Sequence, residues 1–304
     1  GWPGGKPNAD DTHRPERALP FNKRCLIFSP HPDDDIISMG GTFQRLVDQG
    51  HEVHVAYQTS GNIAVSDEEA HRFLEFVVDY NKGFKVESVD TLNTYKRAIS
   101  FLKNKKGSEL DSKEVRLVKG IIRKGEAKAT CRLVGIPESH VHFLDMPFYE
   151  TGRIQKKPLG KGDVNVVSEI IEQIKPHQIY AAGDLADPHG THKVCLDAIF
   201  ASLKNIRHKN FMKDCWVWLY RGAWAEWDIH EIEMAVPMSP DQVMQKRMGI
   251  FKHQSQKDGV VFQGADAREF WQRAEERNQA TAKLYDYLGL AEYEAMEAFV
   301  RYHF

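Results

Sequence analysis

The chain has 304 residues, a formal net charge of -2, and 41% hydrophobic and 28% charged residues. Such a chain can bury one large core, and its near-neutral charge gives no electrostatic attraction to nucleic acid or to a membrane surface. No apolar run approaches the roughly 20 residues that a membrane span needs, and no signal peptide is visible. Nucleic-acid and membrane partners are therefore not expected.

The first residues differ in composition from the rest of the chain. Residues 1–21 are rich in Gly, Pro and charged side chains and begin without Met, which predicts a linker or tail before a single domain at 22–304. The four cysteines are scattered without a Cys-x-x-Cys pair, a pattern typical of buried, reduced thiols in a cytoplasmic protein.

Apolar runs and helical periodicities alternate along the domain. Strands are predicted at 24–29, 52–57, 140–144, 177–182, 214–220 and 229–236. Helices are predicted at 36–49, 66–80, 92–104, 112–132, 164–174, 190–204, 240–256 and 266–288. This alternation predicts an α/β fold with a Rossmann-like, mostly parallel sheet between helices. The last two strands follow each other without a long helix, so the far edge of the sheet is expected to be antiparallel.

Two parts of the domain have a composition of their own. Residues 62–121 are highly charged and are expected to form in part a helical insertion. This insertion would either cap the substrate pocket or extend into solvent. Residues 260–304 are interpreted as a C-terminal helical extension.

A histidine and three carboxylates follow the first predicted strand. The run 29–35 reads Ser-Pro-His-Pro-Asp-Asp-Asp and precedes a helix. Ligands bind at the carboxyl ends of strands in a parallel α/β sheet, so this turn is a candidate site. Because Asp33 and Asp34 are adjacent, the backbone turns their side chains apart. One of them can bind a metal while the other faces the open coordination position.

A second group of histidines follows the strand at 177–182. The run 183–192 contains His189 and His192. Zinc binds imidazole and carboxylate at roughly 2.0 to 2.2 Å, and catalytic zinc sites keep a fourth position for water. His31 and Asp34 with either of these histidines would complete a set of three ligands. A carboxylate beside metal-bound water can then take its proton.

Each motif also has a simpler interpretation. An isolated His-Pro-Asp is usually a turn whose Asp caps a helix, and an isolated His-x-x-His is often a surface pair on a helix. Here both motifs follow predicted strands, and this combination favours a shared metal site.

The first motif together with the late His-x-x-His resembles the LmbE-like (PIG-L) family of zinc-dependent de-N-acetylases. The resemblance implies removal of the N-acetyl group from an N-acetylglucosamine-type amino sugar or from its phosphate or conjugate. By motif position, it implies that His31, Asp34 and His192 bind Zn2+, or another divalent metal such as Fe2+. It also implies that Asp33 is the general base and that His189 protonates the leaving amine or stabilises the oxyanion.

Two weaker motifs extend the resemblance. Residues 122–127 resemble the Arg-x-x-Glu helix of the family, which implies that Arg123 contacts polar or phosphate groups of the substrate. Lys246 and the run 253–256 resemble the family's Lys and His-x-Ser-Gln helix, which packs beside the site.

The chain departs from the family where many members read His-Pro-Asp-His. Here residues 189–192 read His-Gly-Thr-His, so the acid that would orient His189 is absent and Asp184 or Asp187 is the candidate to replace it. This departure keeps open a catalytically weak sugar-binding or regulatory module, and a metal-dependent phosphoesterase using the same ligands is the other alternative. The chain also resembles a module that follows a glucosamine-6-phosphate deaminase-like domain in some bacterial proteins, so an N-terminal fused domain is expected.

Overall fold

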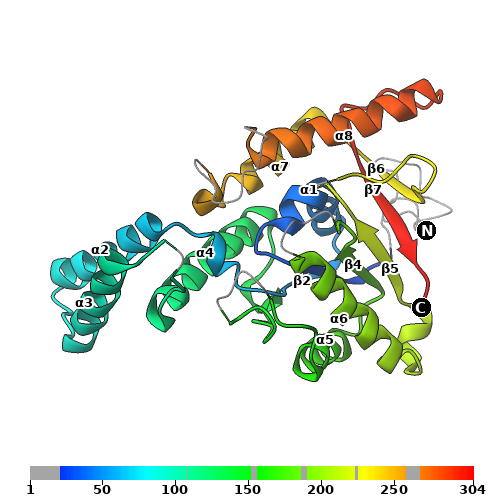
Figure 1. Ribbon diagram of the computed structural model, residues 1–304. Helices are drawn as coiled ribbons and strands as arrows, with labels where there is room; N and C mark the ends of the chain where they lie inside the picture. The colour runs from blue at the N-terminus through cyan, green and yellow to red at the C-terminus, as the bar shows by residue number, and fades with distance from the viewer. Residues whose placement is uncertain (1–20, 108, 152–155, 186–189, 223–224, 258–267) are drawn as a thin grey trace.

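The structure is a computed structural model that describes residues 21–107, 109–151, 156–185, 190–222, 225–257 and 268–304. In these residues seven strands form one sheet in the order β3-β2-β1-β4-β5-β7-β6 (Figure 1). The strands are β1 (Arg24–Ser29), β2 (Glu52–Tyr57), β3 (Val141–Phe143), β4 (Gln178–Ala182), β5 (Trp216–Tyr220), β6 (Met234–Met238) and β7 (Ala295–Tyr302). Strands β1 to β5 are parallel, and β7 is antiparallel to both β5 and β6. The predicted α/β fold with an antiparallel edge is confirmed.

Eight α-helices lie in the part of the chain that the structure describes. They are α1 (Asp34–Asp48), α2 (Asp67–Phe84), α3 (Val89–Asn104), α4 (Lys113–Val134), α5 (Lys161–Ile174), α6 (Thr191–Ile206), α7 (Pro240–Ile250) and α8 (Phe270–Tyr287). Helices α5 and α6 contribute to the core on one face of the sheet, and α1, α4, α7 and α8 contribute to the core on the other (Figure 1). None of the helices in these ranges is long and apolar enough to cross a membrane.

Strand β1 is buried on both faces, which explains its continuous apolar run. Cys25 and Ile27 belong to the core beside α1 and α4, and Leu26 and Phe28 belong to the core beside α5 and α6. Successive side chains of a strand point to opposite faces, so one short segment joins the two cores. The turn that follows β1 is therefore held in place from both sides.

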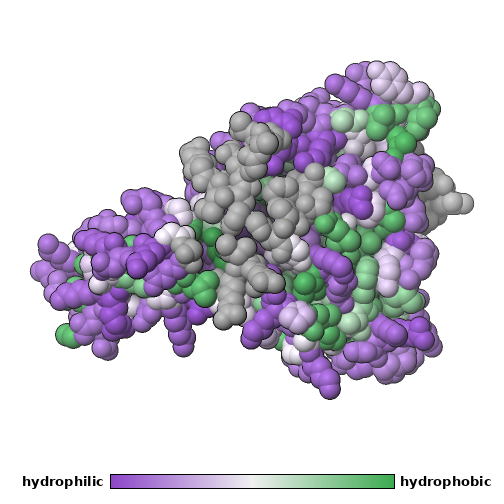
Figure 2. All heavy atoms as spheres, in the orientation of Figure 1, coloured by the Kyte–Doolittle hydropathy of each residue, from purple (hydrophilic) through white to green (hydrophobic). Residues whose placement is uncertain are grey.

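Helices α2 and α3 pack on the first half of α4 and project from the body as an arm (Figure 1). Its small core contains Leu74, Ala98, Ile99 and Val115. On the viewed face the arm is mostly hydrophilic (Figure 2). Residues 62–121 are thus partly helical. That they are an insertion, and that they cap a substrate pocket, stay predictions.

The C-terminal part differs from the prediction. The expected helical extension at 260–304 does contain α8, but it ends in a strand, β7. The strand expected at 229–236 lies at Met234–Met238. Strand β7 was not expected because it begins with Ala, Met and Glu, which favour helices, and because its buried Glu297 hides the apolar pattern.

Glu297 is the centre of a buried polar network that holds β7 against α1 and α7. Its Oε1 accepts hydrogen bonds from the Lys246 ammonium at 2.7 Å and from the Gly41 N–H at 2.9 Å. Its Oε2 accepts from the N–H and the hydroxyl of Thr42, both at 2.7 Å. Lys246 also donates to Asn278 at 2.8 Å. The lysine of the family motif is therefore part of the scaffold.

We expect Glu297→Ala to lower the free energy of unfolding by about 3–5 kcal/mol, because it leaves the Lys246 ammonium buried without its partner. Urea unfolding measures this loss. Glu292→Ala, an exposed carboxylate on the segment before β7, is the control and should change stability by about 0.5 kcal/mol or less. Equal effects of the two substitutions would contradict the role of Glu297.

Candidate metal centre and its surroundings

The turn between β1 and α1 is fixed by hydrogen bonds within the motif itself. The His31 carbonyl accepts from the Ser29 hydroxyl at 2.5 Å and from the Asp33 N–H at 2.8 Å. The His31 N–H in turn donates to Asp34 Oδ2 at 2.8 Å. These bonds hold the imidazole of His31 and the carboxylate of Asp34 on the same side of the turn.

His192, near the start of α6, completes a triangle with these two residues. His31 Nδ1 lies 3.1 Å from Asp34 Oδ2, His192 Nε2 lies 3.2 Å from the same oxygen, and the two nitrogens are 3.3 Å apart. Two ligands at about 2.05 Å from a tetrahedral metal are about 3.3 Å apart. The three atoms therefore have the spacing of one face of a tetrahedral metal site.

The surroundings of the triangle suit metal ligands. His192 Nδ1 lies 2.9 Å from the Asp184 carbonyl, which can only accept, so Nδ1 carries the proton and the Nε2 lone pair is available. Burial alone would raise the pKa of Asp34, but His192 and His31 beside it hold that pKa well below its ordinary value. The donor set is thus two imidazoles and one carboxylate, a combination that zinc binds.

Asp33, the residue next to Asp34, has a partner outside this triangle. Its Oδ1 lies 3.0 Å from Nη2 of Arg123 on α4, and both side chains are buried. Asp33 occupies the N-cap position of α1, yet its side chain makes no capping hydrogen bond. The simpler interpretation of the motif as a helix cap therefore does not describe Asp33, and the two adjacent carboxylates do point apart.

Arg123 is placed more deeply than a residue on a solvated helix face. It is 1% exposed, and among the described residues its Nε and Nη1 have no hydrogen-bond partner. Burial alone would lower the pKa of Arg123, but Asp33 and Glu126 raise it above its ordinary value. The guanidinium stays charged and offers two free donors beside Asp33.

Gly61 allows this close approach. It has φ of +63°, and a Cβ at this position would lie 2.9 Å from Arg123 Nε and 2.9 Å from Cδ of Pro32. Any other residue would push Arg123 away from Asp33. The loop after β2 therefore helps to position Arg123 beside Asp33.

The two weaker motifs meet beside the site. Glu126 accepts from the N–H of Ser255 at 2.6 Å and from its hydroxyl at 2.7 Å. His253 Nε2 contacts the Thr130 hydroxyl at 2.9 Å, while its buried Nδ1 has no partner in the described residues. Burial lowers the pKa of His253 to about 4, so its ring is neutral at neutral pH. His253 and Asp33 line a common cavity of about 20 Å³, enough for one water.

Sequence reasoning gave no role to Asp35. It is fully buried, and it accepts from the Tyr57 hydroxyl at 2.9 Å and from the hydroxyl of Ser29, the last residue of β1, at 3.3 Å. Burial raises the pKa of Asp35 to about 7, although the hydrogen bond from Tyr57 acts in the opposite direction. Asp35 thus ties the motif to β2. Its place in the printed run of three acids was the only signal that could have indicated it.

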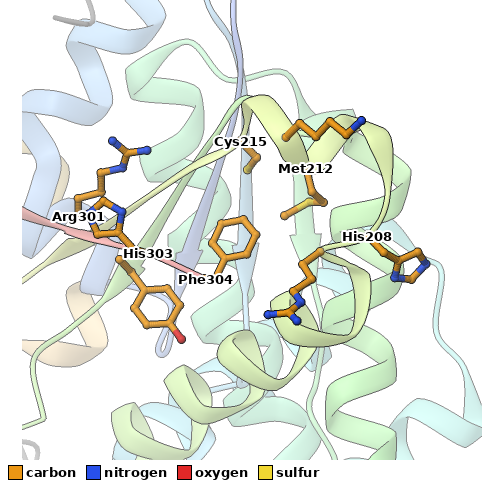
Figure 3. Close-up of a pocket in the computed structure, with 9 residues that line it drawn as sticks. His208, Met212, Cys215, Arg301, His303 and Phe304 are labelled. Atoms are coloured by element: carbon orange, nitrogen blue, oxygen red, sulfur yellow. The ribbon is translucent and has the colours of Figure 1, made fainter.

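Two larger cavities lie at different ends of the sheet. One of about 300 Å³ is near the carboxyl end of β2 and is lined by Ser60, Asn62, Lys113, Arg116, Leu117, Gly120, Ile121, Lys124, Asp145 and Glu150. Another of about 520 Å³ includes Cys215, Met212, Arg301 and His303 (Figure 3). Because Cys215 precedes β5, this second cavity is at the amino ends of the parallel strands, away from the metal triangle.

The structure brings together His31, Asp34 and His192, and it places Asp33 and Arg123 beside them. His189 and Asp187 lie outside the described residues. The carboxylate of Asp184 accepts from the Ala225 N–H at 2.9 Å, and its carbonyl contacts His192. The roles of Asp33 and His189 in catalysis, and of Arg123 in substrate binding, stay predictions.

Comparison with protein-family models identifies the family of this chain. The PIG-L family model, described as GlcNAc-PI de-N-acetylase, matches residues 26–203. The chain belongs to the PIG-L family. The matched region includes both halves of the metal triangle and Arg123, so the resemblance inferred from the sequence is confirmed.

A glucosamine-6-phosphate deaminase-like protein of Bacteroides thetaiotaomicron is 59% identical over 305 residues, which cover 99% of this chain. This chain spans only 46% of that protein's length. The comparisons do not support the expected fused deaminase-like domain, which stays a prediction.

Solved structures share the fold. An N,N'-diacetylchitobiose deacetylase of Pyrococcus horikoshii has a TM-score of 0.56 and 17% identity, covering 92% of this chain and 84% of that one. A 4-carboxy-2-hydroxymuconate hydratase of Pseudomonas putida KT2440 also has a TM-score of 0.56, with 14% identity, covering 92% of this chain and 96% of that one. At these identities the likeness shows the fold alone, and the two proteins carry out different chemistry on it.

We expect Arg123→Met to lower the free energy of unfolding by about 3–5 kcal/mol, because Asp33 then stays buried beside Asp34 without a counter-charge. Arg132→Met, an exposed arginine near the end of the same helix, is the matched control and should have an effect of about 0.5 kcal/mol or less. Urea unfolding of both variants makes the comparison. If Arg123→Met is as mild as the control, the pair does not hold the turn.

Proposed function

We propose that this PIG-L protein removes the N-acetyl group from an N-acetylglucosamine-type amino sugar, or from its phosphate or conjugate, with a divalent metal held by His31, Asp34 and His192. The observation that carries the proposal is the triangle of 3.1 to 3.3 Å between these ligand atoms. The carboxylate of Asp33, the residue next to Asp34, contacts Arg123 and is the proposed base. This arrangement is what hydrolysis of an amide by activated water needs.

Zinc is the proposed metal, since the donor set of two histidines and one carboxylate leaves a fourth position open. When bound, such a metal lowers the pKa of water to about 7 and polarises a carbonyl oxygen. Iron(II) is the alternative, because imidazole and carboxylate suit both ions.

The chain's own groups then supply the proton transfers. Asp33 takes the proton of the water as the water oxygen attacks the acetamide carbon, and Arg123 orients Asp33 through the 3.0 Å ion pair. The carbon–nitrogen bond breaks when the amine receives a proton, for which His189 is the proposed donor. Acetate and the free amine leave.

The cavity of about 300 Å³ near the carboxyl end of β2 favours a polar substrate. Its lining combines hydrogen-bonding groups such as Asn62 with the cations Lys113 and Arg116. Sugar hydroxyl groups can bind to the first kind of group and a phosphate to the second. A cytoplasmic location stays a prediction; all four cysteines are free and buried, as expected from their pattern.

Metal content and turnover should separate in two variants. We expect Asp33→Asn to retain the metal but to lose a factor of about 100 to 10,000 in turnover, because the amide cannot accept the proton while His31, Asp34 and His192 are unchanged. His192→Ala should lose the metal as well. Elemental analysis of the purified proteins and an acetate-release assay measure the two quantities.

Arg132→Met again serves as a control that should preserve both metal and turnover. Equal metal loss in Asp33→Asn and His192→Ala would overturn the assignment of roles. Full turnover in Asp33→Asn would exclude Asp33 as the base.

The reaction class can be tested on a panel of N-acetyl sugars with and without phosphate. We expect acetate release from at least one member, and no release of inorganic phosphate. Phosphate release alone would establish the phosphoesterase alternative. Metal binding without either product would establish a binding or regulatory module.

A further inference from the structure

A second group of metal-ligating side chains lies on β2 and β3, far from the triangle. Glu52 and His54 are on β2, His140 immediately precedes β3, and His142 is on β3. One nitrogen of His54, one of His140 and one carboxylate oxygen of Glu52 all lie within 4.8 Å of one another. The active-site motifs do not include any of these residues.

The strand register explains why these side chains meet. Residues two apart in a strand share a face, which places Glu52 with His54 and His140 with His142. In the parallel pairing Val55 is opposite Val141 and Ala56 is opposite His142. The rings of His54 and His140 consequently stack, with centroids 4.0 Å apart.

The hydrogen bonds of His140 leave one nitrogen free to bind a metal. Its Nδ1 lies 3.1 Å from the Val53 carbonyl, and a carbonyl can only accept, so Nδ1 carries the proton. In the neutral ring Nε2 therefore has an exposed lone pair. This is the arrangement in which a backbone carbonyl orients a metal-binding histidine.

His54 has an equivalent support. Its Nδ1 lies 3.1 Å from His142 Nε2, and its Nε2 lies 3.0 Å from Glu52 Oε1. When a metal takes the place of the proton on Nε2, the Nδ1–H can donate to His142.

Glu52 supplies the negative charge of the proposed site, and its side chain can change its rotamer. Its side chain is 51% exposed, so it can rotate until its oxygen reaches ligand distance. Two imidazoles and one carboxylate, with open positions for water, form a donor set that binds zinc.

We propose that Glu52, His54 and His140 form a second divalent-metal site, of the zinc type, with His142 orienting His54. The site would join β2 to the short edge strand β3. The active-site turn follows the carboxyl end of β1, whereas Glu52 pairs with Arg24 at the amino end, about 17 Å away along the strands. The metal would therefore stabilise the sheet edge and take no part in the hydrolysis.

The test uses metal-free full-length protein with His192→Ala, which removes a ligand of the active-site triangle. Calorimetric titration with Zn2+ alone should find about one remaining site with a micromolar or lower dissociation constant. Adding His140→Ala should weaken this binding at least about 100-fold, and adding His142→Gln should weaken it about 10- to 100-fold. His208→Ala, an exposed histidine elsewhere, is the matched control and should leave it unchanged.

Thermal unfolding gives a second readout. Zn2+ should raise the melting temperature of the His192→Ala protein, because a ligand that binds only the folded state stabilises it. Glu52→Gln, a change at an exposed side chain that does not endanger folding, should abolish most of this rise. Binding that is unaffected by both Glu52→Gln and His140→Ala would show adventitious surface binding only. Absence of binding in the His192→Ala protein would overturn the proposal outright.

Because the first site is disabled throughout, the result is independent of the deacetylase proposal. If the unmodified protein showed no deacetylase activity, the proposal of a second metal site would be unaffected. Failure of the second site would likewise leave the proposed deacetylase intact.

Discussion

The buried ion pair between Asp33 and Arg123 constrains the geometry of the whole site. Two adjacent carboxylates at the start of a helix repel each other, and each contacts partners of its own. Asp34 has His31 and His192, and Asp33 has Arg123 at 3.0 Å. Removing either set of partners would leave a buried charge uncompensated. The pair therefore fixes which acid faces the metal ligands and which is directed to α4.

Other contacts exist to keep Arg123 in place. Gly61 leaves room for its guanidinium, and Glu126 joins α4 to the segment after α7 through Ser255. Lys246 and Glu297 then hold α7, α1 and β7 together. Helix α4 thus contacts Asp33 through Arg123 and the segment after α7 through Glu126, although these segments are far apart in the sequence. Their residues act mainly by positioning.

The sequence predicted what depends on local pattern. Six of the seven strands were predicted from their apolar runs, and the candidate metal ligands from turns at strand ends, because a parallel sheet brings its carboxyl ends to one edge. Features that depend on contacts between residues far apart in the sequence were not predicted. Nothing local to Arg123 indicates that its partner is Asp33, and β7 is a strand only because Glu297 finds Lys246 in the core. The cluster of Glu52, His54 and His140 was not predicted either, because these residues are brought together by the register of β2 and β3.

The same fold supports a deacetylase and a hydratase among the solved structures, so the sheet itself does not determine the chemistry. In this chain the two metal-ligating groups lie at opposite ends of β2 and β1, and their consequences differ for a physical reason. At the carboxyl end the ligands surround an open position beside an acid, which suits reaction with water. At the amino end the proposed ligands Glu52 and His54 lie on β2 and His140 immediately precedes β3, so a metal there would close the long loop between these two strands. Closing such a loop reduces the entropy of the unfolded chain, so the expected effect of the second metal is on folding, as for a crosslink.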